Sequence, residues 1–137
     1  MRMCANVPAQ HAIQTALGGY QSVNELIVPG GRFYEQSKLA SRLLNEIPGV
    51  SCVEPRGALY CFPRLDPEVY PIESDEGFAT GLLREKRLLV AHGSAFGLQT
   101  NDHFRITTLP DKKTLEDAVE RIAHYLSLLR RGQTDHG

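Results

Sequence analysis

The chain has 137 residues, of which 42% are hydrophobic, and this is enough apolar material for the core of one domain. Fifteen basic and sixteen acidic residues leave a formal net charge of −1, which disfavours nucleic-acid binding and attraction to an anionic membrane. The longest apolar run, residues 58–62, is far shorter than the ~20 residues that a membrane-spanning helix needs.

The first predicted helix covers about residues 8–17. Pro8 suits a first helical turn, and Gly18-Gly19 ends the apolar repeat. The apolar positions repeat at helical spacing and are mostly small: Ala9, Ala12, Ile13, Ala16 and Leu17. Such a stripe suits close packing against a larger surface, so we expect the isolated chain to self-associate through it.

A longer helix is predicted after residues 28–31 and ends near Glu46, before a Pro-Gly pair. Its apolar residues form one face, made of Leu39, Ala40, Leu43, Leu44 and Ile47. The period then changes to two, which predicts strands at residues 50–52 and 58–62. We expect these strands to form a hairpin around residues 54–57.

The C-terminal half is predicted to alternate helices with short strands. Ser74 is expected to cap a helix over about residues 75–85, and buried strands are expected at residues 88–91 and 104–108.

The last helix has the clearest apolar repeat, beginning after Asp111 and ending at Gly132. Helices layered on a small sheet predict an α+β fold, a two-layer α/β sandwich.

The cysteines and the N-terminus point to a reducing compartment. Cys4, Cys52 and Cys61 form no C-x-x-C unit and cannot all pair with one another. The first eight residues lack the apolar stretch of a signal peptide. We therefore predict a cytoplasmic protein whose thiols serve as small core side chains.

Arg105 is the first candidate for a functional residue. Strand alternation places Phe104 and Ile106 on one face and Arg105 and Thr107 on the other. A guanidinium offers a planar fork of donors that suits a carboxylate. An arginine on the solvated face of a one-sided sheet has the same pattern, so the strand alone leaves both interpretations open.

Glycines and a histidine give weaker signals. The loop of residues 93–97 has a glycine at each end and could bring backbone N–H groups to an anion, but it is also an ordinary connection. Gly57 could allow a ligand to approach or simply serve a turn. The histidines have no metal-ligand spacing, and we predict no metal site. His92 and Ser94 leave open an unrelated enzyme, although the G-x-S-x-G motif of a serine nucleophile is missing.

Lys38 follows a serine, as Schiff-base lysines often do. It lies in the middle of a predicted helix among Glu35, Gln36 and Ser41, next to buried Leu39. We interpret it as a solvated lysine and assign it no cofactor role.

Five segments in order give the chain a specific resemblance. They are Asn6-Val7-Pro8-Ala9-Gln10, Pro29-Gly30-Gly31-Arg32, Pro55-Arg56-Gly57-Ala58-Leu59-Tyr60, Gly93-Ser94-Ala95-Phe96-Gly97 and His103-Phe104-Arg105-Ile106. Over residues 1 to about 130 the chain resembles the C-terminal third of class I, fold-type I aminotransferases that depend on pyridoxal 5'-phosphate (PLP). The bacterial alanine (glutamate–pyruvate) aminotransferases are the most similar group.

The resemblance implies roles for two residues. Arg105 matches the small-domain arginine that binds the substrate α-carboxylate as a bidentate pair. Gly57 matches a glycine that leaves room beside the substrate. The loop of residues 93–97 matches a segment near the same pocket, and no role is transferred to His92.

The resemblance also implies what this chain lacks. The family's Schiff-base lysine, the aspartate at the pyridine nitrogen and most phosphate ligands lie upstream of the matching segments. We therefore expect no catalytic residue, no cofactor-binding residue and no covalent PLP attachment here, and we expect the isolated chain to be inactive.

The resulting expectation is part of an aminotransferase that exchanges an amino group between an alanine- or glutamate-type amino acid and a 2-oxo acid. Residues 1–28 would end the large domain, 29–132 would form the small domain and 133–137 a tail. The expected partners are the substrates, the large domain and, in the complete enzyme, a second copy in a homodimer. The alternative is a non-catalytic carboxylate-binding or interaction domain derived from this fold.

Overall fold

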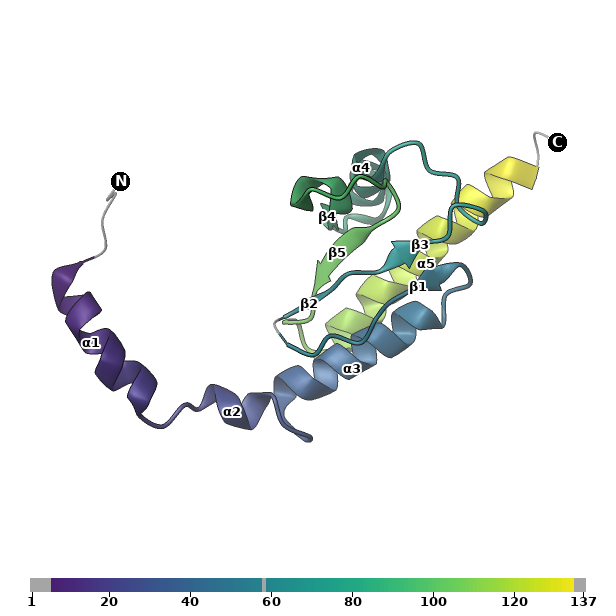
Figure 1. The fold of residues 1–137 in the computed structure, drawn as a ribbon. Helices are drawn as coiled ribbons and strands as arrows, with labels where there is room; N and C mark the ends of the chain where they lie inside the picture. Colours follow the sequence, from purple (N-terminus) through teal and green to yellow (C-terminus); the bar gives the residue numbers. More distant parts are fainter. Residues whose placement is uncertain (1–5, 58, 135–137) are drawn as a thin grey trace.

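Three helices cover one side of a small antiparallel sheet system in the computed structural model, which describes residues 6–57 and 59–134. Helices α3 (Arg32–Asn45) and α5 (Lys112–Thr134) pack against each other, and α4 (Asp75–Lys86) packs against α5 and strand β4 (Ala91–His92). The two-layer α+β architecture is therefore confirmed (Figure 1).

The sheet is built from distant parts of the chain. Strand β5 (Phe104–Thr107) lies between β2 (Tyr60–Cys61) and β4, antiparallel to both. A second pair joins β1 (Val50–Ser51) to β3 (Arg64–Leu65). An isolated bridge between Arg64 and His103 links the two sheets.

The predicted hairpin between residues 50–52 and 58–62 is wrong. Strand β1 pairs with β3 instead, with buried Val50 opposite buried Leu65. The Asn45 side chain accepts a hydrogen bond from Cys52 N (2.9 Å) and donates one to Cys52 O (2.8 Å). Because α3 satisfies the backbone of Cys52 in this way, no neighbouring strand is needed there.

The predicted buried strand at residues 88–91 is also misplaced. Helix α4 ends at Lys86 and is capped by Arg87, which has a left-handed backbone with φ of 54°, and the strand begins only at Ala91. Leu89 is 75% exposed, whereas Val90 is buried. The apolar run therefore includes a connection that the sequence did not distinguish from a strand.

The predicted helices are confirmed with small changes in their ends. Helix α1 (Val7–Gly18) begins at Asn6, whose side chain accepts a hydrogen bond from Ala9 N at 3.2 Å. The short helix α2 (Val23–Leu26) was not predicted. Helix α5 continues past Gly132 to Thr134. The expected division into residues 1–28, 29–132 and 133–137 stays a prediction.

The core lies between the sheet and helices α3, α4 and α5. Among its fully buried side chains are Leu44, Cys61, Leu65, Leu82, Phe104, Ile122 and Leu126. Cys52 is buried as well, so both described thiols occupy the core as predicted; Cys4 lies outside the described residues. No helix within the described ranges is long and apolar enough to cross a bilayer.

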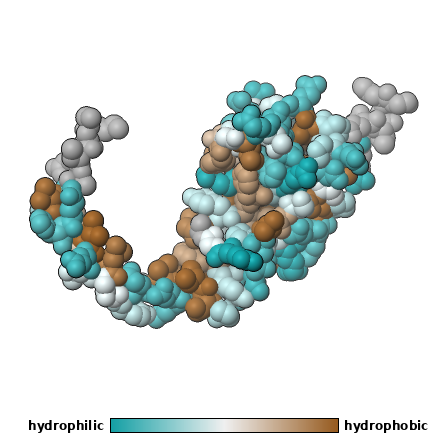
Figure 2. Space-filling view, viewed as in Figure 1, coloured by the Kyte–Doolittle hydropathy of each residue, from teal (hydrophilic) through white to brown (hydrophobic). Residues whose placement is uncertain are grey.

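Helix α1 stands apart from the core (Figure 1), and none of its residues is buried. Its apolar side chains Val7, Ile13 and Leu17 are 62%, 51% and 69% exposed. Figure 2 shows hydrophobic residues along this extension and on toward the body.

Candidate functional site

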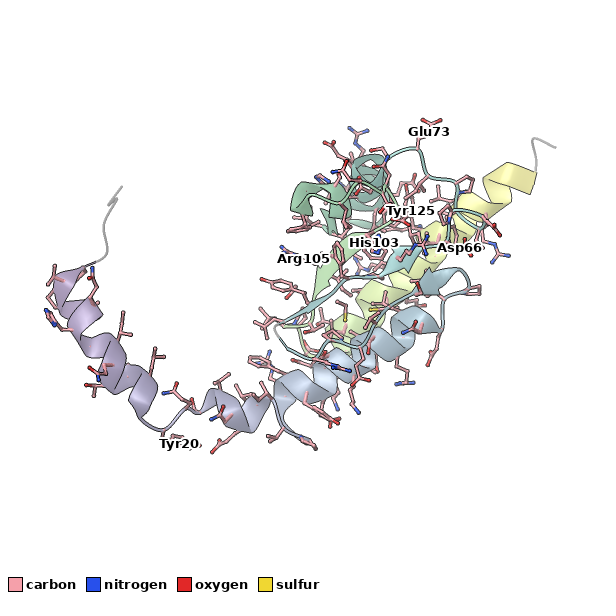
Figure 3. All side chains as sticks on the ribbon, in the orientation of Figure 1. Tyr20, Asp66, Glu73, His103, Arg105 and Tyr125 are labelled. Carbon is pink, nitrogen blue, oxygen red and sulfur yellow. The ribbon has the colours of Figure 1, made fainter. Side chains whose placement is uncertain are left out.

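Arg105 lies on the face of the sheet that the core helices leave open. Along β5 the buried residues Phe104 and Ile106 alternate with half-buried Arg105 and exposed Thr107, as the sequence predicted. Tyr60 pairs with Thr107, which places its side chain diagonally next to Arg105 on the same face. Figure 3 shows Arg105 on the β5 side of the fold.

Two aromatic rings flank the guanidinium. The Cζ atom of Arg105 lies 4.3 Å from the ring centroid of Tyr60 and 4.2 Å from that of Phe96. Phe96 comes from the short 3-10 helix η1 (Gly93–Phe96), which follows β4 directly. The predicted glycine loop is thus a turn of helix that supplies an aromatic side chain to the arginine.

The guanidinium has no anionic partner among the residues that the structure describes. No ion pair or hydrogen bond within them uses a donor of Arg105, and its described contacts are those with the two rings. Aromatic faces hold a cation without occupying its N–H donors with carboxylate or carbonyl oxygens. The arrangement can therefore accept a bidentate carboxylate from outside.

Gly57 is exposed, and a Cβ atom built on it meets nothing within 4 Å. It borders a cavity of about 490 Å³ together with residues of α3, including Tyr34 and Lys38. Arg105 does not line that cavity, so the structure does not bring the two predicted substrate-binding residues into one pocket. A role for Gly57 stays a prediction.

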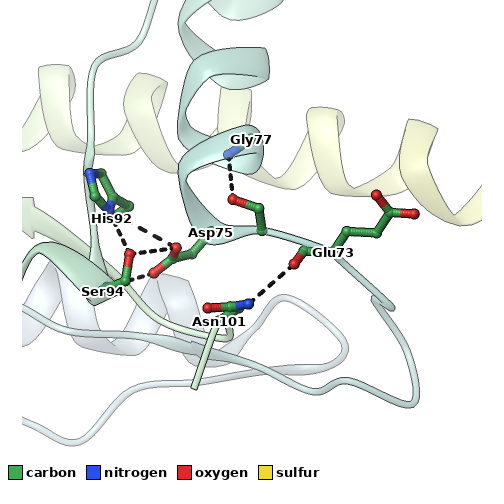
Figure 4. Close-up of polar contacts among 7 residues, drawn as sticks. Glu73, Asp75, Gly77, His92, Ser94 and Asn101 are labelled. Carbon is green, nitrogen blue, oxygen red and sulfur yellow. Dashed lines mark hydrogen bonds and ion pairs between the residues drawn. The ribbon is translucent and has the colours of Figure 1, made fainter. Parts of the chain in front are cut away.

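Ser94, His92 and Asp75 form a compact network (Figure 4). Asp75 accepts hydrogen bonds from the Ser94 backbone N–H at 2.7 Å and from the Ser94 hydroxyl at 2.8 Å. His92 Nδ1 lies 2.8 Å from Ser94 Oγ. Because the Ser94 hydroxyl donates to the carboxylate, the His92 tautomer that fits this network carries its proton on Nδ1 and donates to Ser94.

That proton arrangement is unlike the arrangement of a serine nucleophile. A nucleophilic serine donates its proton to the imidazole that will remove it, and the carboxylate orients the far side of that imidazole. Here the carboxylate accepts the hydrogen bond of the Ser94 hydroxyl, and the serine oxygen accepts one from the histidine. The geometry thus gives no support to an enzyme that uses Ser94 or His92.

Lys38 is an exposed ion-pairing residue. Its Nζ lies 3.8 Å from Glu54 and 4.8 Å from the ring centroid of Tyr34. A hydrogen bond with Tyr34 and the charge of Glu54 raise the pKa of Lys38 above its usual value. A lysine that forms a Schiff base needs the opposite shift, so this side chain does not fit that role.

The sequence did not single out Phe96 and Tyr60 as partners of Arg105. Tyr60 and Arg105 are 45 positions apart in the chain, and only the pairing of β2 with β5 brings them together. Phe96 could have been noticed as an aromatic residue inside a glycine-bounded loop. That its ring contacts Arg105 could not have been predicted, because this contact depends on how η1 turns back toward β5.

Comparison with known proteins now gives the site its family context. Residues 1–122 match the family model for aminotransferase class I and II. The chain belongs to the class I and II aminotransferase family. Members of this family depend on PLP.

Individual relatives of the chain are also aminotransferases. The chain is 53% identical over 131 residues to the glutamate-pyruvate aminotransferase AlaA of Haemophilus influenzae and 54% identical over 131 residues to an alanine aminotransferase of Mycobacterium tuberculosis. These alignments cover 96% of this chain but only 32% and 30% of the relatives. The chain therefore spans about a third of their length.

Solved structures of aminotransferases likewise match most of this chain with about a third of their own length. An aminotransferase from Escherichia coli matches with a TM-score of 0.84 and 53% identity, over 90% of this chain and 31% of that one. An alanine aminotransferase from Pyrococcus furiosus matches with a TM-score of 0.73 and 33% identity, over 91% of this chain and 31% of that one.

Two lysines of the described residues, Lys38 and Lys112, do not fit the covalent attachment of PLP. Lys38 has a raised pKa and is held by Glu54 and Tyr34, while Lys112 lies 3.5 Å from Glu35. Both ammonium groups are thus engaged by neighbouring carboxylates on the surface. We derive no catalytic step through the cofactor on this chain.

Proposed function

We propose that this chain is the part of an alanine- or glutamate-type aminotransferase that binds the substrate α-carboxylate, with Arg105 as the binding residue. The complete enzyme would exchange an amino group between an amino acid and a 2-oxo acid. The observation that carries the proposal is the Arg105 guanidinium, which contacts the rings of Tyr60 and Phe96 and has no carboxylate partner among the residues that the structure describes. Its relatives' names, alanine and glutamate-pyruvate aminotransferase, support the substrate class.

The role of Arg105 is to bind and to orient. The planar fork donates two parallel hydrogen bonds to a carboxylate, which fixes the direction of the bonds around the substrate Cα. Such orientation lowers the barrier for a reaction at Cα because fewer motions must be frozen in the transition state. PLP, bound elsewhere in the complete enzyme, would supply the electron sink for that reaction.

The proposal includes partners outside this chain. Groups that hold the cofactor come from the remaining two-thirds of the enzyme, so the isolated chain is inactive in transamination. The complete enzyme is a cytoplasmic homodimer in this proposal, and Gly57 leaves room beside the substrate.

A chimera tests the proposal. This chain replaces the matching segment of the Haemophilus influenzae glutamate-pyruvate aminotransferase, with which it shares 53% identity. We expect the chimera to transfer the amino group of alanine to 2-oxoglutarate. Arg105→Lys should raise KM for both substrates roughly 10- to 100-fold, because a hydrogen bond to a charged group contributes about 1.5–3 kcal/mol.

The controls separate the two candidate functions. Arg84→Lys changes an exposed arginine on α4 that has no described ion pair, and it should leave KM within twofold. Unchanged KM values in Arg105→Lys would refute the carboxylate role. A folded, PLP-loaded chimera without transamination would favour the non-catalytic binding domain, provided that the isolated chain binds pyruvate but not methyl pyruvate.

A further inference from the structure

The position of Phe96 over Arg105 depends on how η1 is fixed to the rest of the fold. Phe96 is 47% exposed, so burial alone does not hold its ring in place. Its ring contacts Phe62 edge-on, with 6.0 Å between centroids. The strongest attachment of η1 lies two residues earlier, at Ser94.

Ser94 is bound to the first residue of α4. Asp75 is only 2% exposed and directs both carboxylate oxygens at Ser94, one toward the backbone N–H and one toward the hydroxyl. A second attachment lies at the start of η1, where Gly93 N donates to His103 O at 2.9 Å, next to β5, while Gly97 N closes the turn itself by donating to Ser94 O at 3.0 Å. The 3-10 turn is thus fixed between α4 and β5.

The Asp75 carboxylate is suited to this task because it stays ionised. Burial disfavours its charge, but the two hydrogen bonds from Ser94, the Glu76 N–H and nearby His92 more than compensate, and its pKa lies below the usual value. The N-terminal end of α4 also favours a negative charge. Charge-assisted hydrogen bonds are shorter and stronger than neutral ones.

The network differs from an ordinary helix cap. The cap of α4 is already supplied by Ser74, whose hydroxyl accepts a hydrogen bond from Gly77 N at 3.2 Å. Asp75 is therefore free of that task and reaches across to another segment. The two hydrogen bonds that the buried Asp75 carboxylate accepts from Ser94 fix the position of η1 relative to α4.

We propose that Asp75 and Ser94 are positioning residues for the carboxylate site: they hold η1 so that Phe96 packs against the Arg105 guanidinium. This inference rests on the proposed function of Arg105. The Phe96 ring acts together with the Tyr60 ring, which also contacts the guanidinium, so that the N–H fork keeps one orientation before the ligand arrives. Preorganisation of this kind strengthens binding because less side-chain freedom is lost on association.

Nuclear magnetic resonance of the 137-residue chain, labelled with ¹⁵N at arginine, tests the inference. The Nε–Hε signal of Arg105 is assigned from its absence in Arg105→Lys. Its order parameter and its ring-current shift report on its contacts with the Phe96 and Tyr60 rings, and only Phe96 lies on η1. Pyruvate is then added, and its dissociation constant is taken from the same signal.

We expect graded effects. Asp75→Ala removes both bonds, Ser94→Ala removes the hydroxyl bond alone, and Ser94→Thr keeps a hydroxyl. The order parameter of Arg105 should fall most in Asp75→Ala, less in Ser94→Ala and be restored in Ser94→Thr. The affinity for pyruvate should fall about threefold in Ser94→Ala and about tenfold in Asp75→Ala.

Ser74→Ala is the matched control, because it removes a serine hydroxyl at the same end of α4 without touching η1. It should reduce stability yet leave the Arg105 signal unchanged. An unchanged order parameter and shift in folded Ser94→Ala would overturn the inference, even where Asp75→Ala does not fold. If wild type fails to bind pyruvate, the proposed function fails, while the order parameters still decide whether Asp75 and Ser94 position Arg105.

Discussion

Arg105 carries a full charge at a point where the described part of the chain provides aromatic rings in place of a counter-ion. Cation–π contacts contribute about 0.5–1 kcal/mol each at exposed sites, so two of them favour one orientation of the side chain but do not replace an anion. Tyr60 and Phe96 are 44% and 47% exposed, so their contacts belong to this weaker class. The charge is therefore held in place and still available to a ligand.

Phe96→Leu tests the ring at this scale. Leucine keeps apolar bulk but loses the negative ring face, so the affinity of Arg105 for pyruvate should fall about two- to fivefold. Titration calorimetry or line-shape analysis measures the change. Tyr20→Leu, at a ring that is 77% exposed and has no described contact with a cation, should leave the affinity unchanged. Equal losses in both variants would contradict a specific contact.

Asp102 gives a prediction about pH. Burial disfavours its charge, but hydrogen bonds from Thr100, Arg64 and His103 outweigh burial and hold its pKa well below the usual value. Arg64 Nε lies 2.7 Å from one carboxylate oxygen and His103 Nδ1 lies 2.7 Å from the other. The folded state therefore prefers the ionised form of Asp102 more than the unfolded state does.

Asp102→Asn should lower the free energy of unfolding at pH 7 by about 2 kcal/mol. Because the folded pKa lies below the unfolded value of about 3.9, this stabilisation is complete above about pH 5 and is lost as pH falls through the folded pKa. Urea unfolding at pH 7 and pH 3 should show the difference shrinking in acid. Asp117→Asn breaks an exposed pair with Arg121 and should cost less than about 0.5 kcal/mol. A pH-independent loss in Asp102→Asn would contradict the role of the charge.

Helices α3 and α5 form the main support of the sheet, and their contact can be tested. Ile122 is fully buried on α5, so Ile122→Ala should reduce the free energy of unfolding by about 3 kcal/mol. Leu128, on the same helix, is 39% exposed, and Leu128→Ala should cost less than half as much. Denaturant unfolding of both variants measures this, and similar losses would show that α5 does not bury the face described here.

At the scale of elements, the helices could be predicted because their signals are local. At the start of three helices a side chain accepts a hydrogen bond from the backbone N–H three residues later; these residues are Asn6, Ser74 and Asp111. The apolar repeat of each helix follows directly in the sequence. The strands could not be predicted in the same way. Most are two residues long, and their partners lie far away in the sequence, as with β2 and β5.

The candidate site shows the same division. The face of β5 on which Arg105 lies could be predicted from the alternation within that strand. Its proposed role came from the resemblance to the aminotransferases. The partners Tyr60 and Phe96 and the link from Asp75 to Ser94 depend on distant segments meeting in space. No local pattern around Asp75 distinguishes a carboxylate that reaches another loop from one that simply begins a helix.

At the scale of the whole molecule, the projecting helix α1 determines how the isolated chain behaves. Ile13 and Leu17 are exposed and surrounded by other exposed apolar residues. We expect the chain to associate as its concentration rises, because association buries this surface. Sedimentation velocity across a hundredfold range of concentration measures this.

A double variant, Ile13→Glu with Leu17→Glu, should keep the chain monomeric over that range. Leu89→Glu, at a residue that is 75% exposed on the connection between α4 and β4, serves as the control and should associate like wild type. Association that persists in the double variant would assign it to another surface.

The most direct test of the central claim is a titration of the Arg105 Nε–Hε resonance with pyruvate, with methyl pyruvate as the neutral comparison. We predict a saturable shift of this resonance with pyruvate, since a carboxylate accepts the free N–H donors, and little change with the ester. The same response to both ligands, or no response to either while the chain remains folded, would contradict a carboxylate site at Arg105.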